Sequence, residues 1–193
     1  MNLLQALPLH VIAVLREFRT CEFTTLDKKG TPVTWPVSPW IDEARGRIVI
    51  TTSIGLPEKA FNVRRDGRVA LSFSEPLASG LTNPPAVVVQ GDAVAPDQVV
   101  TWSEELAALW PILYRRQPAG MVYGSNVLMR KFFDWYYMRL LIQITPRRIL
   151  WWEGCDFTQQ PQILSATLPQ ATLLTPPLSV TTLSMPKEAI HVG

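Results

Sequence analysis

The sequence predicts a mostly β domain, an antiparallel barrel with flanking helices. Six or seven short segments rich in β-branched and aromatic residues recur along the chain, and polar turns separate them. These strands follow one another too closely for the alternating strands and helices of a doubly wound sheet. Apolar residues make up 47% of the 193 residues, which is enough for the core of one ordinary domain.

The N-terminal third predicts one helix and three strands. Residues 3–18 carry apolar side chains at helical spacing, and Pro8 offers an alternative starting point because proline suits a first helical turn. Strands are expected over residues 21–26, 31–41 and 47–52. The second holds three prolines, which favours an edge or a bulged strand. The third, RIVITT, is apolar on both faces and predicts a buried strand.

The rest of the domain continues the pattern. The expected elements are a helix over 57–65, strands over 68–74 and 86–94, helices over 97–115 and 125–135, and strands over 136–145 and 148–152. Gly91 marks a bulge or a close approach within its strand. We expect one domain over residues 1–155. Residues 156–193, rich in Pro, Thr and Leu, are expected to form an extended arm on the body or on a partner, with disorder as the alternative.

Composition and charge exclude several classes of function. Eighteen basic against sixteen acidic residues give a net charge of +2, which is too balanced for a nucleic-acid binder. No apolar run is long enough to cross a bilayer, and the N-terminus lacks the basic start of a signal peptide, so a cytoplasmic protein without membrane contact is expected. Two histidines and two distant cysteines predict no metal site. The cysteines are expected to be free thiols, with a disulfide between them as the alternative.

The segment from Thr51 to Lys59 is the most informative for chemistry. Three hydroxyl side chains, Thr51, Thr52 and Ser53, end a buried strand, and a helix begins a few residues later. The first turn of a helix offers unpaired N–H groups and a positive dipole end, which disfavour the cation of Lys59 unless an anion binds there. The pattern therefore indicates a phosphate site without a Walker loop. The alternative is that Lys59 extends into solvent beside Glu58.

Three further features carry a structural and a functional interpretation. Gln90 sits in an apolar strand next to Gly91, where it binds either a neighbouring backbone group or the polar edge of a ligand ring. Trp152 belongs to an aromatic pair that divides between core and interface, or stacks on a ligand. The basic pair Arg64 and Arg65 suits the negative end of its own helix.

Four stretches together resemble the FMN-binding split β-barrel proteins related to pyridoxamine 5′-phosphate oxidase. They read GTPVTWPVSPWID, RGRIVITTSIGLPEKAFNVRRDGRVALSFSEP, PAVVVQGDAV and LIQITPRRILWW, and they span residues 23–152. The resemblance implies a six-stranded antiparallel split barrel. It also implies a homodimer with one flavin in each of two equivalent clefts between the subunits.

The resemblance further implies a set of cofactor-binding residues. At the phosphate they are Thr51, Thr52, Ser53 and Lys59, and beside the isoalloxazine they are Ser38, Pro39 and Trp40. Gln90 would contact a polar edge of the ring, and Trp152 would come from the partner subunit.

The function expected from the resemblance is an FMN-dependent oxidoreductase acting on an unidentified small molecule. No catalytic acid or base stands out in the sequence. The C-terminal segment TLSMPKEAIHVG lacks the Arg-x-His motif with which the family binds the substrate phosphate. Thr51 and Thr52 stand where the pyridoxamine-phosphate oxidases have a basic residue. Oxidation of pyridoxamine phosphate itself is therefore not expected. The alternatives are an F420-dependent reductase, which Arg64 and Arg65 leave open, a non-enzymatic flavin- or haem-binding module, and a scaffold without cofactor.

Overall fold

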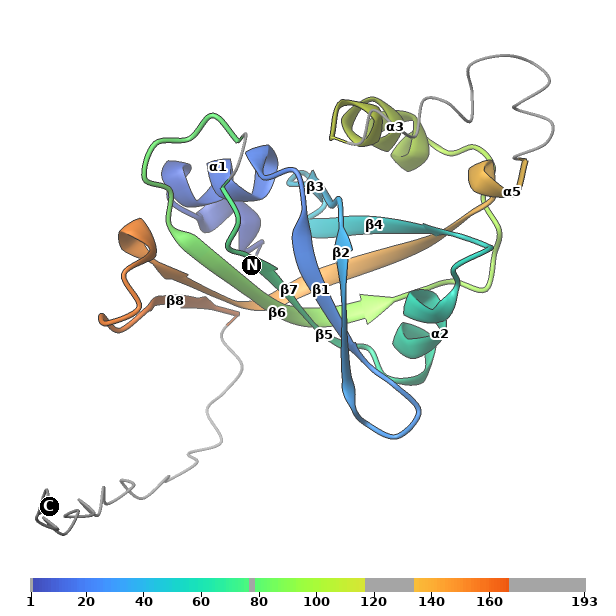
Figure 1. Ribbon diagram of the computed structural model, residues 1–193, viewed down its shortest axis with the longest axis horizontal. Coiled ribbons are helices and arrows are strands. Elements are labelled where there is room, and N and C mark those ends of the chain that lie inside the picture. Colours follow the sequence, from blue (N-terminus) through green and yellow to red (C-terminus); the bar gives the residue numbers. More distant parts are fainter. Residues whose placement is uncertain (1, 77–78, 117–133, 167–193) are drawn as a thin grey trace, which may run out of the picture.

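The computed structural model describes residues 2–76, 79–116 and 134–166 (Figure 1). Most of the helix expected over residues 125–135 lies outside this part of the chain, as does the arm beyond residue 166. No helix in the described ranges is long and apolar enough to cross a membrane.

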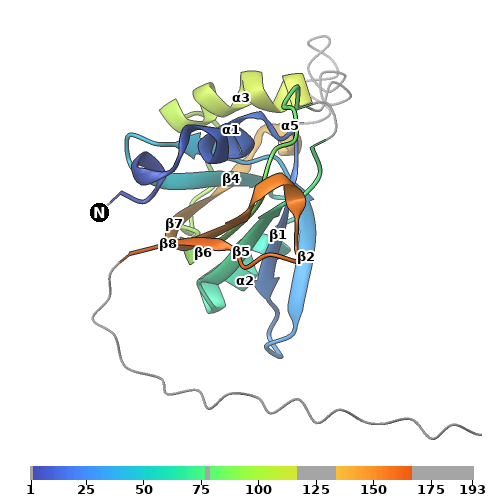
Figure 2. The same cartoon turned by 90° about the vertical axis from the view of Figure 1, so that its left-hand side faces the viewer.

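The body is one antiparallel sheet of eight strands, curved into a half-barrel (Figures 1 and 2). Seven strands follow the order β2-β1-β5-β6-β7-β4-β3, and β8 pairs with β7. The long β7 pairs with β6 along one edge and with β4 and then β8 along the other. The strands are β1 (Cys21–Leu26), β2 (Pro32–Val37), β3 (Trp40–Asp42), β4 (Arg47–Ser53), β5 (Arg68–Phe73), β6 (Ala86–Val94), β7 (Arg139–Trp152) and β8 (Gln162–Ser165).

The six strands implied by the resemblance are therefore too few. The segment 31–41 divides at Ser38 and Pro39 into β2 and β3, which form the two ends of the main strand order and confirm the edge position that the prolines predict. Residues 162–165, inside the expected arm, lie extended on β7 as β8.

The two strands expected on either side of Pro146 form a single strand, because a bulge in β7 beside the proline, with Arg147 as its unpaired residue, lets the pairing with β6 continue. Pro146 lies opposite Gly91, and the register shifts between Gln90 and Gly91. A Cβ on Gly91 would lie 2.4 Å from the carbonyl oxygen of Thr145, so only glycine allows this approach. The close approach expected at Gly91 is confirmed, whereas the extra residue of the bulge lies opposite it, on β7.

Two helices contribute to the main core inside the half-barrel. After the short 3-10 helix η1 (Leu4–Ala6), α1 (Leu9–Glu17) begins directly after Pro8, as expected, and α2 (Glu58–Arg65) follows β4. Both bury apolar side chains against the same interior residues of the sheet. In β4, Ile48 and Ile50 face this core while Val49 belongs to a second cluster, so the strand is buried on both faces as its sequence predicts.

The helix α3 (Glu104–Arg116) covers the outer face of β4 and β7 through that second cluster, and the short α5 (Asp134–Tyr137) leads into β7. α3 begins seven residues later than expected. Ser103 Oγ accepts a hydrogen bond from the backbone N–H of Leu106 at 3.1 Å and caps its first turn. Val100, which lies inside the expected helix, is extended instead of helical, because its backbone forms a β-bridge of two hydrogen bonds with Arg139.

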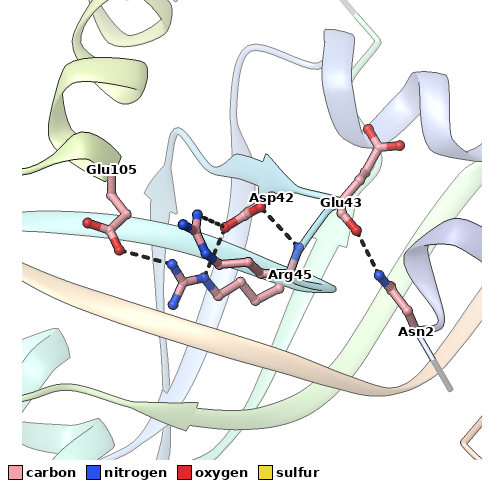
Figure 3. Close-up of polar contacts among 6 residues, drawn as sticks. Asn2, Asp42, Glu43, Arg45 and Glu105 are labelled. Carbon is pink, nitrogen blue, oxygen red and sulfur yellow. Dashed lines mark hydrogen bonds and ion pairs between the residues drawn. The ribbon is translucent and has the colours of Figure 1, made fainter.

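A buried carboxylate fixes the turn between β3 and β4 and ties it to α3 (Figure 3). Asp42, only 5% exposed, accepts hydrogen bonds from the guanidinium groups of Arg45 and Arg47 at 3.2 and 3.1 Å. Arg47 also donates to Glu105 of α3 at 2.9 Å. On the other side of the turn, Asn2 donates to the carbonyl oxygen of Glu43 at 2.7 Å. The cluster therefore holds α3 and the N-terminus against the same turn.

Candidate functional site

A cavity of about 260 Å³ opens where β4 ends and β7 begins. Residues of α2, α3 and α5 and of the end of β2 complete its wall. The lining residues are Pro36, Val37, Ser38, Thr51, Thr52, Ser53, Leu56, Lys59, Leu113, Trp135, Tyr136 and Arg139. The structure thus brings five of the sequence-predicted site residues to one place: Ser38, Thr51, Thr52, Ser53 and Lys59.

The sequence reasoning missed Arg139, which is the most deeply buried cation of this cavity. Its side chain is 7% exposed, and its backbone pairs with Val100 on one side and with Ser53 in the β4–β7 register on the other. Its guanidinium donates to Thr51 Oγ1 at 2.9 and 3.3 Å and lies 5.4 Å from the ring centre of Trp110. The sequence pattern that could have indicated it is an arginine directly before the apolar run LLIQI, because a charge buried at such a position requires hydrogen-bonding or charged partners.

Within the described part of the chain, Lys59 and Arg139 give the lining of this cavity an excess of positive charge. Lys59 is half-buried, and burial lowers the pKa of its ammonium group, with Arg139 lowering it further against an opposing effect of Glu58. Burial also lowers the pKa of Arg139. No carboxylate forms an ion pair with either cation within the described ranges, and none of the lining residues above is acidic. An anion bound between them would remove the electrostatic cost.

The three hydroxyl groups at the end of β4 have different roles. Thr51 Oγ1 accepts from Arg139 and orients that guanidinium. Thr52 Oγ1 donates to the carbonyl oxygen of Leu56 at 2.6 Å and closes the loop that leads to α2. Ser53 Oγ has no hydrogen-bond partner among the described residues, so it is available to a ligand. No described side chain caps α2, which leaves its first turn open beside Lys59.

The residues expected beside the isoalloxazine lie in different surroundings. Ser38 lines the cavity, and its hydroxyl donates to the carbonyl oxygen of Arg19 at 3.0 Å. Pro39 is buried, and its carbonyl oxygen accepts from Arg116 at 2.6 Å. Trp40 packs against the small cluster under α3 instead of lining the cavity. In one copy of the chain, Ser38 is therefore the member of this trio that reaches the cavity.

Gln90 and Trp152 lie away from the cavity. Gln90 is exposed and lines a separate open hollow of about 290 Å³ together with Gly91, Arg68 and Arg147. Trp152 ends β7 and packs on Phe157, with ring centres 5.5 Å apart. Their expected contact with a ligand, from the partner subunit in the case of Trp152, stays a prediction.

The two arginines at the end of α2 are engaged elsewhere. Arg64 donates to the carbonyl oxygens of Ala95 and Pro96 at 2.9 and 2.7 Å and pairs with Asp97 at 2.8 Å. Arg65 donates to Asn62 Oδ1. Neither lines the cavity, so among the described residues the cations available to an anion there are Lys59 and Arg139.

Comparison with solved structures identifies proteins that share this fold. No family model matches the sequence, and no curated protein matches it. The solved structure of General Stress Protein 26 from Bacillus anthracis is similar with a TM-score of 0.53 at 15% identity, over 86% of this chain and all of that one. A conserved hypothetical protein from Mycobacterium tuberculosis is similar with a TM-score of 0.53 at 20% identity, over 86% of this chain and 94% of that one.

A heme-binding protein from Mycobacterium smegmatis is also similar, with a TM-score of 0.52 at 18% identity. The match covers 82% of this chain and 59% of that one. At such identities these likenesses show the fold, an antiparallel split half-barrel with flanking helices, and not the ligand.

Proposed function

We propose that this chain is a flavoprotein that binds the phosphate of FMN in the cavity between Lys59 and Arg139. The observation that carries the proposal is the pair of buried or half-buried cations with no carboxylate partner in the described chain. A phosphate dianion matches this pair in charge, and the fork of Arg139 can donate to two of its oxygens. Ser53 and the uncapped first turn of α2 add neutral donors.

The size of the cavity supports a ligand that is only partly enclosed. Its volume of about 260 Å³ lies below the roughly 300–1,000 Å³ of sites that surround a whole small molecule. The phosphate end of the flavin would fill it, and the ring would extend past Ser38. A second copy of the chain would then cover the ring, as the homodimer implied by the resemblance requires.

Exposed apolar side chains at the mouth fit that arrangement. Leu56 and Trp135 line the cavity yet are 66% and 42% exposed. Burial of such groups against a partner is favourable, since each buried apolar side chain contributes about 1.5–3 kcal/mol. The homodimer is therefore part of the proposal.

FMN, when bound, supplies the chemistry of hydride or electron transfer. The protein's residues bind and orient it: Thr51 fixes the guanidinium of Arg139, and Thr52 fixes the loop that carries Leu56. An oxidoreductase acting on a small molecule beside the ring is the activity that this arrangement supports best.

Two related ligands fit the described residues less well. A cofactor with a longer anionic tail, such as F420, favours further cations along the cavity, but Arg64 and Arg65 are bound to protein groups. The similarity to a heme-binding protein raises haem as a second candidate. His10, the histidine within the described ranges, is bonded to Glu153 at 3.0 Å and does not line this cavity.

The proposal is tested by comparing FMN with riboflavin, which lacks the phosphate. Quenching of flavin fluorescence on titration with the purified protein should give an affinity for FMN at least about 10-fold above that for riboflavin, the effect of one charged hydrogen bond. Equal affinities would refute the phosphate site. A Soret shift on titration with haemin, without flavin binding, would support the haem alternative instead. NAD(P)H-dependent reduction of the bound flavin, with turnover of an acceptor, would support the oxidoreductase.

A further inference from the structure

A second cavity, also of about 260 Å³, lies where the C-terminal ends of α1 and α3 approach the loop before β6. Its described lining residues are Glu17, Arg19, Ser79, Gly80, Arg115 and Arg116. It shares no described residue with the cavity of Lys59 and Arg139. Three guanidinium groups and one carboxylate in so small a space give an excess of two positive charges.

Hydrogen bonds to the backbone hold the side chain of Arg116 in place at this cavity. Its side chain is 8% exposed, and its two terminal nitrogens donate to the carbonyl oxygens of Pro39 and Arg16, each at 2.6 Å. Its Nε is buried and has no hydrogen-bond partner in the described ranges. A buried donor of this kind carries a cost of about 1–3 kcal/mol, which a hydrogen-bonding ligand would reduce.

The neighbouring charges favour an anion in this cavity. Burial lowers the pKa of Arg116, and Arg115 lowers it further. Arg115 pairs with Glu17 at a long 3.6 Å, and both side chains are substantially exposed. This long, exposed pair leaves most of the donors of Arg115 open, so a ligand carboxylate could replace or join Glu17 there.

We propose that the cavity lined by Arg19, Arg115 and Arg116 binds a small carboxylate with two or more negative charges. Two charges on the ligand balance the excess of the site. Arginine forks suit the planar carboxylate in a bidentate arrangement, which lysine does not provide. The site is independent of the proposed flavin phosphate, because a different set of cations forms it.

The segment between β2 and β3 separates the two cavities. Ser38 lines the Lys59 cavity and donates to the carbonyl oxygen of Arg19, while Pro39 accepts from Arg116. A carboxylate in the second cavity therefore sits behind the wall of the first.

The test uses citrate as the probe and isothermal titration of the full chain. The wild type should bind citrate saturably in the millimolar range or tighter. Arg19→Gln and Arg115→Gln should each weaken binding by about 10-fold, the effect of losing one charged hydrogen bond. Arg148→Gln, which removes one exposed arginine that lines neither cavity, should leave the affinity unchanged.

Two outcomes overturn the proposal. One is the absence of saturable citrate binding to the wild type. The other is loss of binding in Lys59→Gln with retention in both arginine variants, because citrate would then occupy the Lys59 cavity. Arg116→Gln is left out of the decisive set, since Arg116 also joins α1 to the β2–β3 segment and its loss can unfold the protein. FMN binding by Lys59→Gln and by Arg115→Gln, measured in parallel, separates failure of this site from failure of the flavin site.

Discussion

The guanidinium of Arg139 donates to Thr51 Oγ1 through two of its nitrogens, at 2.9 and 3.3 Å. The two residues come from neighbouring strands and lie 88 positions apart in the chain. A hydroxyl orients the cation but does not neutralise it. Arg139 therefore keeps its full charge while its position is fixed, which is the arrangement that an anion site requires and a purely structural ion pair does not.

Replacement of Arg139 should weaken cofactor binding without abolishing the fold. In Arg139→Gln the affinity for FMN should fall by about 1.5–3 kcal/mol, roughly 10- to 150-fold, as one charged hydrogen-bonding partner is lost. The affinity for riboflavin should change little. Flavin fluorescence titration measures both. Arg148→Gln serves as the matched control, and equal losses for the two flavins in Arg139→Gln would contradict a phosphate contact.

Lys59 should give the unliganded protein a distinctive dependence on pH. Burial and Arg139 hold the pKa of Lys59 below its ordinary 10.5 in the folded state. Between the lowered value and 10.5 the unfolded chain binds more protons than the folded one, so the contribution of Lys59 to stability rises with pH in that window. The free energy of unfolding of the wild type, taken relative to that of Lys59→Gln, should therefore increase from neutral pH to about pH 10.

Urea denaturation at the two pH values measures this difference. Lys29→Gln, which replaces an exposed lysine in the β1–β2 turn, is the control and should show no such gain. Saturation with FMN should reverse the trend for Lys59, because a bound phosphate favours the charged ammonium. If the difference in the free energy of unfolding between wild type and Lys59→Gln is independent of pH, with and without FMN, Lys59 is a solvated surface residue that contacts no phosphate.

The sequence predicts the part of the cavity that is formed by residues 51–59, because the patterns that indicate it lie close together in the chain. The strand 47–52, the hydroxyls that end it and the helix with Lys59 follow one another within a few residues. The edge position of β2 follows from its prolines for the same reason. Each of these depends on the chemistry of neighbouring residues and needs no knowledge of the tertiary pairing.

Arg139 could not be placed in the same way. Its role depends on the β4–β7 register, which sets Ser53 opposite Arg139 and brings Thr51 within reach. Register follows from packing of the whole sheet, and a shift of one residue would turn the arginine to the other face. The strand through Pro146 was misjudged for a similar reason, since its pairing with β6 depends on the close approach of Gly91, more than fifty residues away.

The contact between Gly91 and Thr145 should make Gly91 intolerant of a side chain. In Gly91→Ala the new Cβ would lie 2.4 Å from a backbone carbonyl oxygen, so β6 or the bulged part of β7 must shift. We expect a loss of about 1–3 kcal/mol in the free energy of unfolding, the usual cost of overpacking. Urea denaturation measures it. Gln90→Ala, at the exposed neighbouring position, should stay within about 0.5 kcal/mol of the wild type, and equal stability of the two variants would contradict the close approach.

The two cysteines should differ sharply in reactivity. Cys21 is fully buried in β1, and burial raises the pKa of its thiol, with Glu22 raising it further, so the reactive thiolate is suppressed. Cys155 is partly exposed, at the end of the short 3-10 helix η3 (Glu153–Cys155), and both thiols are free. Titration of the native protein with Ellman's reagent should release one equivalent, and a second should appear only after unfolding. Cys155→Ser should remove the native signal. Rapid modification of two thiols in the folded protein would mean that β1 opens readily, whereas none before or after unfolding would mean that the cysteines are paired.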